Sequence, residues 1–257
     1  MKNPFLDREG KPLFTVTLSG RGKDQHQPVR EFVESWSEFH WGNIDSIFAF
    51  KEFTPLYGGR TWNGNEISDS DYSWLRENGI GWRIPTTNIL INEEIYKQNR
   101  EFLEKYHEEG NTLIIARDTF AKLVKKDFPK YTIECSVIRN TTTIEQLEKR
   151  LEVYDTIVPD TWAFNHEMDL SKISDELKPR MRLFLNISCA YECKNRVCYG
   201  AISKQHLGQP TGSRCSVTEE TYDLKAQMTT FNLGKFLDYG FRKFKVLRPR
   251  SFIETAY

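Results

Sequence analysis

Residues 112–158, TLIIARDTFAKLVKKDFPKYTIECSVIRNTTTIEQLEKRLEVYDTIV, contain the alternation of segments that decides the fold. Three stretches, 112–116, 131–138 and 156–158, are rich in apolar and β-branched residues and are expected to be strands. The two stretches between them, 119–126 and 143–154, have the apolar spacing of amphipathic helices. Strands that alternate with helices in this way are typical of a parallel sheet.

The same alternation extends along the rest of the chain. Further strands are expected at residues 13–18, 44–50, 82–84, 181–185 and 243–247, and further helices at 28–39, 92–107, 170–177 and within 219–239. Eight such strands predict an α/β fold, a parallel (β/α)8 TIM-type barrel that allows some distortion, with residues 1–257 as a single domain. The alternative is an open doubly wound sheet, but no Gly-x-Gly-x-x-Gly motif follows any strand.

Composition and charge narrow the class of protein. The 36 basic and 36 acidic side chains balance, so no overall field would attract the protein to nucleic acid or an anionic membrane. The segment 242–250 is the one candidate basic patch. No apolar run of membrane-spanning length and no signal-peptide core is present, which predicts a cytoplasmic protein without a membrane partner. Because cytoplasmic thiols stay reduced, the five cysteines favour metal binding or catalysis over disulfides.

Four of those cysteines are predicted to bind one metal centre. Cys189, Cys193 and Cys198 have the spacing Cys-x3-Cys-x4-Cys, and sixteen residues separate Cys198 from Cys215. Their irregular spacing favours a 4Fe-4S cluster over zinc, which remains the alternative, and predicts a cysteine-rich metal-binding loop at about 186–216. Cys135 lies within an apolar strand and is expected in the core, although it is also a rival of Cys215 as fourth ligand.

Polar residues at the strand ends are the other candidates for a site, because the loops after the strands form the active site of such barrels. These residues are Ser19, Lys51, Asn88, Arg117, Asp118, Arg139, Asp160, Asn186, Lys245 and Arg248. The predicted catalytic residues are Asn186, Lys245, Arg248 and His166. The predicted substrate-binding residues are Asn88, Arg117, Asp118, Arg139 and Arg196. Asp169, close to His166, is expected to cap a helix.

Three segments carry a resemblance to a known family. They are Asn186 followed by Cys189-x3-Cys193-x2-Arg196, the stretch 131–138 with 155–159 after it, and the closing segment 240–248. In these segments the chain resembles the collagenase-like peptidase family of unknown catalytic type. The resemblance implies an iron–sulfur protein of oxygen-independent hydroxylation, acting on a tRNA uridine, a 23S rRNA cytidine or the ubiquinone ring, with prephenate as the oxygen source in the RNA branch. The chain has Cys198-Tyr199 where many members have a histidine after the arginine.

These observations give three hypotheses for function. The first is an iron–sulfur barrel enzyme that performs hydroxylation or related redox chemistry on a nucleobase, as part of RNA, or on a small aromatic molecule. The second is a zinc-stapled barrel that acts as a binding or assembly protein, with a protein partner or a second copy of the chain. The third is a barrel without metal that uses reactive thiols. Peptidase activity is not expected, because no Ser–His–Asp or Cys–His arrangement has usable spacing.

Overall fold

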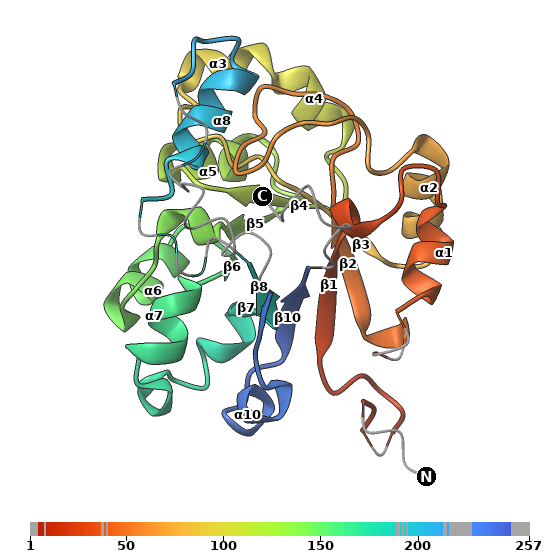
Figure 1. The fold of residues 1–257 in the computed structure, drawn as a ribbon, viewed down its shortest axis with the longest axis vertical. Helices are drawn as coiled ribbons and strands as arrows, with labels where there is room; N and C mark the ends of the chain where they lie inside the picture. Colours follow the sequence, from red (N-terminus) through yellow and green to blue (C-terminus); the bar gives the residue numbers. More distant parts are fainter. Residues whose placement is uncertain are drawn as a thin grey trace.

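Eight parallel strands form the centre of the molecule in the computed structural model, which describes residues 5–7, 9–36, 39, 41–188, 191, 193, 195–212, 215 and 228–247 (Figure 1). The strand order is β6-β5-β4-β3-β2-β1-β10-β7, and a parallel bridge between Ile157 and Met181 links the two edge strands. The strands are β1 (Thr15–Ser19), β2 (Ile44–Phe48), β3 (Gly81–Ile84), β4 (Thr112–Ile115), β5 (Thr132–Cys135), β6 (Thr156–Ile157), β7 (Arg182–Phe184) and β10 (Lys243–Val246). The predicted (β/α)8 TIM-type barrel is therefore confirmed, with all eight strands at their predicted places.

Helices connect the strands and surround the barrel. They are α1 (Val29–Glu34), α2 (Asp69–Glu77), α3 (Glu93–Gln98), α4 (Arg100–Lys105), α5 (Asp118–Asp127), α6 (Ile144–Leu151), α7 (Thr161–His166), α8 (Cys198–His206) and α10 (Leu233–Asp238). Side chains of Asn92 and Thr143 cap α3 and α6 by accepting backbone N–H bonds, as these residue types do at helix starts. Within the described part of the chain, no helix has the length and apolarity needed to cross a membrane.

Three helix predictions need correction. The helix expected at 92–107 is two helices, because Asn99 leaves helical geometry between α3 and α4. The helix expected at 170–177 is wrong: only a 3-10 turn, Leu170–Lys172, forms there, and Asp169 caps it as predicted. Of the helix expected within 219–239, residues 216–227 lie outside the described residues, and the remainder contains β9 (Thr229–Thr230) and α10.

The barrel interior is a polar layer covered by an apolar one. Glu134 is fully buried, accepts a hydrogen bond from Lys245 Nζ at 2.6 Å, and is ion-paired with Arg83 and, at 3.6 Å, with Arg182. Arg182 also binds Asp45 at 2.8 Å. On the side of the strands' carboxyl ends, apolar side chains close this layer from above; they include Phe48, Val158, Phe184, Ile187 and Leu247. The ammonium of Lys245 lies 5.0 Å and 5.8 Å from the ring centres of two of them, Phe48 and Phe184.

The segment after β7 crosses this mouth of the barrel. It begins with β8 (Asn186–Ile187), which pairs antiparallel with β9, and ends with α8 beside α3 (Figure 1). Ser203 of α8 accepts a hydrogen bond from Asn88 through its carbonyl and from Ile89 N–H through its hydroxyl, both at 3.1 Å. His206 Nδ1 bonds the carbonyl of Tyr57 at 2.8 Å. These contacts hold α8 against the loops that follow β2 and β3.

Candidate functional site

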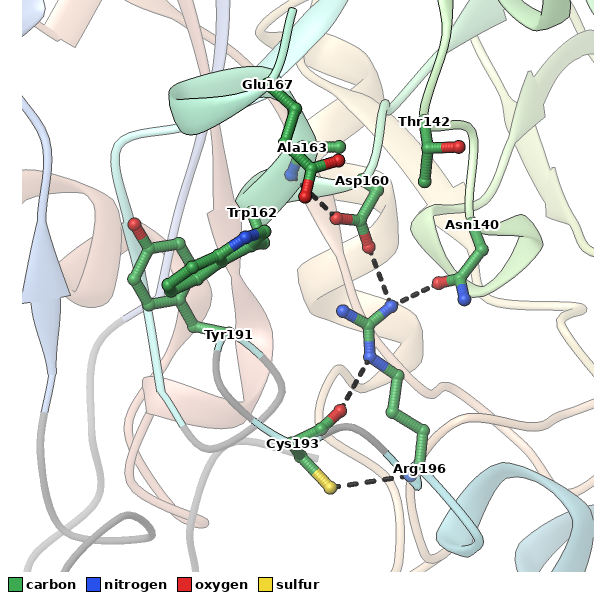
Figure 2. A pocket seen from close by; sticks show the side chains of 9 residues that line it. All are labelled: Asn140, Thr142, Asp160, Trp162, Ala163, Glu167, Tyr191, Cys193 and Arg196. Atoms are coloured by element: carbon green, nitrogen blue, oxygen red, sulfur yellow. Dashed lines mark hydrogen bonds and ion pairs between the residues drawn. The ribbon is translucent and has the colours of Figure 1, made fainter.

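A cavity of about 630 Å³ opens at the carboxyl ends of the strands, which is where barrel enzymes hold their active sites. Its walls come from the loops after β5 and β6 and from the segment after β8 (Figure 2). It is lined by Asn140, Thr142, Asp160, Trp162, Ala163, Glu167, Tyr191, Cys193 and Arg196. The volume lies within the range of small-molecule sites, and the lining combines aromatic rings with a few polar groups, as such sites do.

Arg196 is at the centre of the cavity's polar wall. Its Nη1 forms an ion pair with Asp160 at 2.7 Å and a hydrogen bond with Asn140, while its Nε donates to the carbonyl of Cys193 at 3.2 Å (Figure 2). Both Arg196 and Asn140 have positive φ angles, 43° and 48°, a conformation that non-glycine residues rarely adopt. The guanidinium thus ties Cys193 to the loops after β5 and β6 through its Nη1 and Nε donors.

Among the cysteines that the structure describes, Cys193 lines the cavity. Its Sγ accepts a hydrogen bond from the backbone N–H of Arg196 at 3.4 Å (Figure 2), and Cys198 is the first residue of α8. Metal-bound sulfur commonly accepts such hydrogen bonds from backbone N–H groups, so the surroundings of Cys193 fit those of a metal ligand. Cys189 lies outside the described residues, and among the described ones no group of three His, Cys, Asp or Glu side chains is arranged around a common point.

Aromatic rings form the opposite wall. Trp162 lies against His166 and Tyr191, with ring centres 4.4 Å and 5.3 Å away. His166 Nε2 forms a hydrogen bond of 2.5 Å with the Tyr191 hydroxyl, which points away from Arg196 and Asp160 in Figure 2. The Trp162 side chain is exposed, so its ring offers a flat surface to a ligand. The predicted residue His166 therefore supports this wall from behind.

Three predicted site residues are used for internal bonds away from the cavity. Lys245 is sealed in the barrel interior beside Glu134. The amide of Asn186 binds the backbone of Leu247 at both ends, as donor and as acceptor at 2.7 Å, and so extends the contact between β10 and the segment after β7. Asn88 is fully buried and donates to the carbonyls of Pro55 and Ser203.

The remaining predicted residues are divided among other places. Asp118, the first residue of α5, accepts hydrogen bonds from Arg139 at 3.0 Å and Tyr154 at 2.8 Å. Arg117 is exposed and lines a different cavity. Arg248 lies outside the described residues. Of the predicted substrate-binding set, Arg196 alone lines the mouth cavity.

Cys135 belongs to the hydrophobic core. Because Glu134 points into the barrel, its neighbour Cys135 points outward toward the helices, as alternation along a strand requires. Burial raises the pKa of its thiol to about 12, with the charges of Arg150 and Arg139 opposing that effect. The core prediction for Cys135 agrees with this position, which faces away from the mouth.

The sequence-based candidates did not include several residues of the cavity. Asn140 and Thr142 lie within loops, where polar residues are ordinary, so nothing distinguished them. Trp162 belongs to α7, a helix that was not predicted, and α8 was likewise hidden within the expected cysteine loop. Asp160 was a strand-end candidate, and it both caps α7 by accepting from Ala163 N–H and binds Arg196.

Fold and cavity together define a single-domain TIM-type barrel with its candidate site at the carboxyl ends of the strands. Over its length the chain is similar to the structure of the U32 peptidase Mk0906, with a TM-score of 0.61, 12% sequence identity, and coverage of 99% of this chain and 98% of that one. It is also similar to a xylose isomerase-like TIM barrel/4-hydroxyphenylpyruvate dioxygenase fusion protein, with a TM-score of 0.47, 9% identity, and coverage of 95% and 40%. No protein-family model and no curated protein matches the sequence. At these identities the likeness shows the fold alone. At the level of the fold, the similarity to this U32 peptidase structure confirms the peptidase-family resemblance that was drawn from the sequence.

Proposed function

We propose that the protein is a barrel enzyme with a 4Fe-4S cluster at its mouth, which performs redox chemistry, such as oxygen-independent hydroxylation, on a nucleobase or a small aromatic molecule. The proposed ligands are Cys189, Cys193, Cys198 and Cys215. The observation that carries the proposal is that Cys193 lines the same cavity as the exposed ring of Trp162. A centre held there would lie beside the bound ring, in a compartment such as the cytoplasm where thiols stay reduced.

The surroundings of Cys193 support this proposal. Hydrogen bonds to the sulfur ligands and nearby charge tune such clusters, and the N–H of Arg196 already donates to Cys193 Sγ at 3.4 Å. When bound, the cluster would supply electron transfer. The role of Arg196 in this proposal is to position Cys193, because its side chain is engaged by Asp160, Asn140 and the carbonyl of Cys193.

The other cavity residues suit a planar, hydrogen-bonding substrate. The Trp162 ring offers a stacking surface, which is tolerant of different aromatic rings. Across from it, the Asn140 amide and Thr142 hydroxyl are able to bond ring substituents, and the carboxylate of Glu167 is able to accept from an N–H or O–H group. These side chains would bind and orient the substrate while the redox step takes place at the cysteine side.

Metal analysis of anaerobically purified protein tests this proposal. We expect brown protein that absorbs near roughly 400 nm, as iron–sulfur clusters do, with about four iron and four sulfide per chain. Cys193→Ala should lose the colour, while the matched control Cys135→Ala should keep it, because Cys135 faces the helix layer. Colourless protein with stoichiometric zinc, or equal loss of colour in both variants, would contradict the proposal.

A zinc-stapled barrel is the second candidate, favoured by the ties that Arg196 makes between the cysteine segment and the loops after β5 and β6. A zinc ion there would have a structural role, holding the loops at the barrel mouth together, and would take no part in catalysis. In that case zinc would be retained through purification, and a chelator would lower the unfolding temperature. The Trp162→Ala variant separates the two candidates further, because it should impair binding of an aromatic substrate and leave a zinc staple intact.

A further inference from the structure

A second cavity, of about 530 Å³, lies between the start of α3 and α5, which are neighbours in Figure 1. It shares no lining residue with the mouth cavity. It is lined by Ile91, Asn92, Glu93, Arg117, Thr119, Phe120, Lys122, Leu123 and Lys126. A volume of this size accommodates a small organic ligand.

One face of α5 forms the floor and one side of this second cavity. Thr119, Lys122, Leu123 and Lys126 are spaced i, i+3, i+4 and i+7, so they share that face of the helix. Burial of Val124 on the other face packs α5 against the barrel. The residues along the cavity are therefore fixed in position by a well-packed helix.

Charge in the second cavity is unbalanced. Arg117, Lys122 and Lys126 contribute three cations, and within the described part of the chain none of them forms an ion pair. The single anion, Glu93, is already paired with Lys97 at 2.9 Å.

Neighbouring cations on α5 and α4 differ in this respect. Lys125 of α5 is paired with Asp155 at 2.8 Å, and Arg100 of α4 is paired with Asp127. The three cations that line the cavity thus lack the close carboxylate that Lys125 and Arg100 have, and their charge favours an anionic ligand by complementarity.

Apolar side chains supply the rest of the lining. Ile91, Phe120 and Leu123 face the cavity, and Leu90 beside it is exposed by 36%. We infer that this second cavity binds a small amphipathic anion, a molecule with a carboxylate or phosphate head and an apolar body. The head would lie among Arg117, Lys122 and Lys126, and the body would cover the apolar floor.

Calorimetric titration with simple probes tests this inference. We expect one octanoate or octyl phosphate to bind per chain, while acetate, which has the head alone, and octylammonium, which has the opposite charge, bind at least about tenfold more weakly. The two octyl anions distinguish a carboxylate site from a phosphate site. The double variant Lys122→Glu/Lys126→Glu should weaken binding at least about tenfold, and raised salt should weaken it in the parent protein.

Matched controls separate this site from general surface charge. The exposed pair Lys149→Glu/Lys172→Glu carries the same charge change elsewhere and should leave binding intact. Cys193→Ala should also leave it intact, so failure of the proposed metal centre would not affect this test. If circular dichroism shows that Lys122→Glu/Lys126→Glu is unfolded, the single variant Arg117→Gln replaces it and should likewise weaken binding of the octyl anions. Binding of octylammonium as tight as that of the anions, equal loss in the control pair, or no binding of either octyl anion at millimolar concentration would overturn the inference.

Discussion

Glu134 provides the sharpest test of how the barrel interior is held together. Its carboxylate is fully buried and contacts Lys245, Arg83 and Arg182. With Asp45 bound to Arg182, this layer contains three cations and two carboxylates. Glu134→Gln keeps the shape of the side chain but leaves three cations facing a single carboxylate. We therefore expect a large loss of stability from replacing one carboxylate oxygen by an amide nitrogen.

The expected magnitude follows from the cost of breaking a buried ion pair. Removing one partner of such a pair costs about 3–5 kcal/mol, because an uncompensated charge remains in the interior. Against a total stability of roughly 5–15 kcal/mol, this is a large fraction. Lys245→Met in addition to Glu134→Gln removes one of the excess cations, so the double variant should be more stable than the sum of the two single changes predicts.

The pH dependence gives an independent check on the same network. Burial opposes ionisation of Glu134, but the attraction of Arg83, Lys245 and Arg182 outweighs it and holds the pKa at about 2, below the ordinary 4.5. The stabilisation is therefore complete above pH 4.5 and is lost as the pH falls toward 2, an amount of about 3 kcal/mol. Glu134→Gln should lack this loss, so the stabilities of variant and parent should converge in acid.

Urea denaturation followed by circular dichroism measures these quantities. The exposed control Glu145→Gln, on α6, should shift the free energy of unfolding by less than about 0.5 kcal/mol. A cost below about 1 kcal/mol for Glu134→Gln at pH 7, or strict additivity with Lys245→Met, would refute the account of a shared buried carboxylate.

Further predictions concern three side chains outside the mouth cavity. Burial lowers the pKa of His206 below its usual 6.5 despite its bond to a backbone carbonyl, and its Nε2 accepts a hydrogen bond from the backbone N–H of Trp62 at 3.2 Å. The neutral histidine therefore stabilises the fold above pH 6.5, and this contribution is lost as the pH falls. Between pH 7 and 5 the unfolding temperature of the parent should decrease more steeply than that of His206→Gln. Asn186→Ala should cost about 1–3 kcal/mol in urea denaturation, because two backbone groups of Leu247 lose their partner. Cys135→Ala should cost about 1 kcal/mol in the same assay, the loss expected for a small core side chain and not for a ligand.

The sequence predicted the strands well because each is a short apolar run between turn residues. The ends were less certain: residues 131–138 were expected to form one strand, but the chain leaves it after Cys135 and makes a 3-10 turn at Val137–Arg139. The strand propensity of β5 residues does not show where the neighbouring strand ends. β6 has two residues, which pair with Glu134 and Cys135, so β5 has no partner on that side beyond Cys135. The prediction of one helix at 92–107 missed a break at Asn99. The side-chain amide of Asn99 donates a hydrogen bond to the carbonyl of Ile95, and such local side-chain bonds compete with helical geometry.

The candidate site was harder to predict because strand-end position does not specify direction. Lys245 and Asn88 both follow the rule that polar residues gather at strand ends, yet one neutralises Glu134 inside the barrel and the other holds α8. Arg196, in contrast, was predicted from the motif Cys193-x2-Arg196 that carries the family resemblance, and it does lie at the cavity. The local motif was therefore more informative than the global position, because residues three apart in a tight loop constrain each other directly.

The mouth of the barrel depends on one segment that is held at both ends. Near its start, Arg196 ties Cys193 to the loops after β5 and β6, and near its end His206 and Ser203 tie α8 to the loops after β2 and β3. Since α8 is a single helix that begins at Cys198, a displacement at His206 would be carried toward the cysteines with little bending. Protonation of His206 should then loosen the cysteine side of the cavity as well as the loop at Trp62, a coupling that follows from the rigidity of a nine-residue helix.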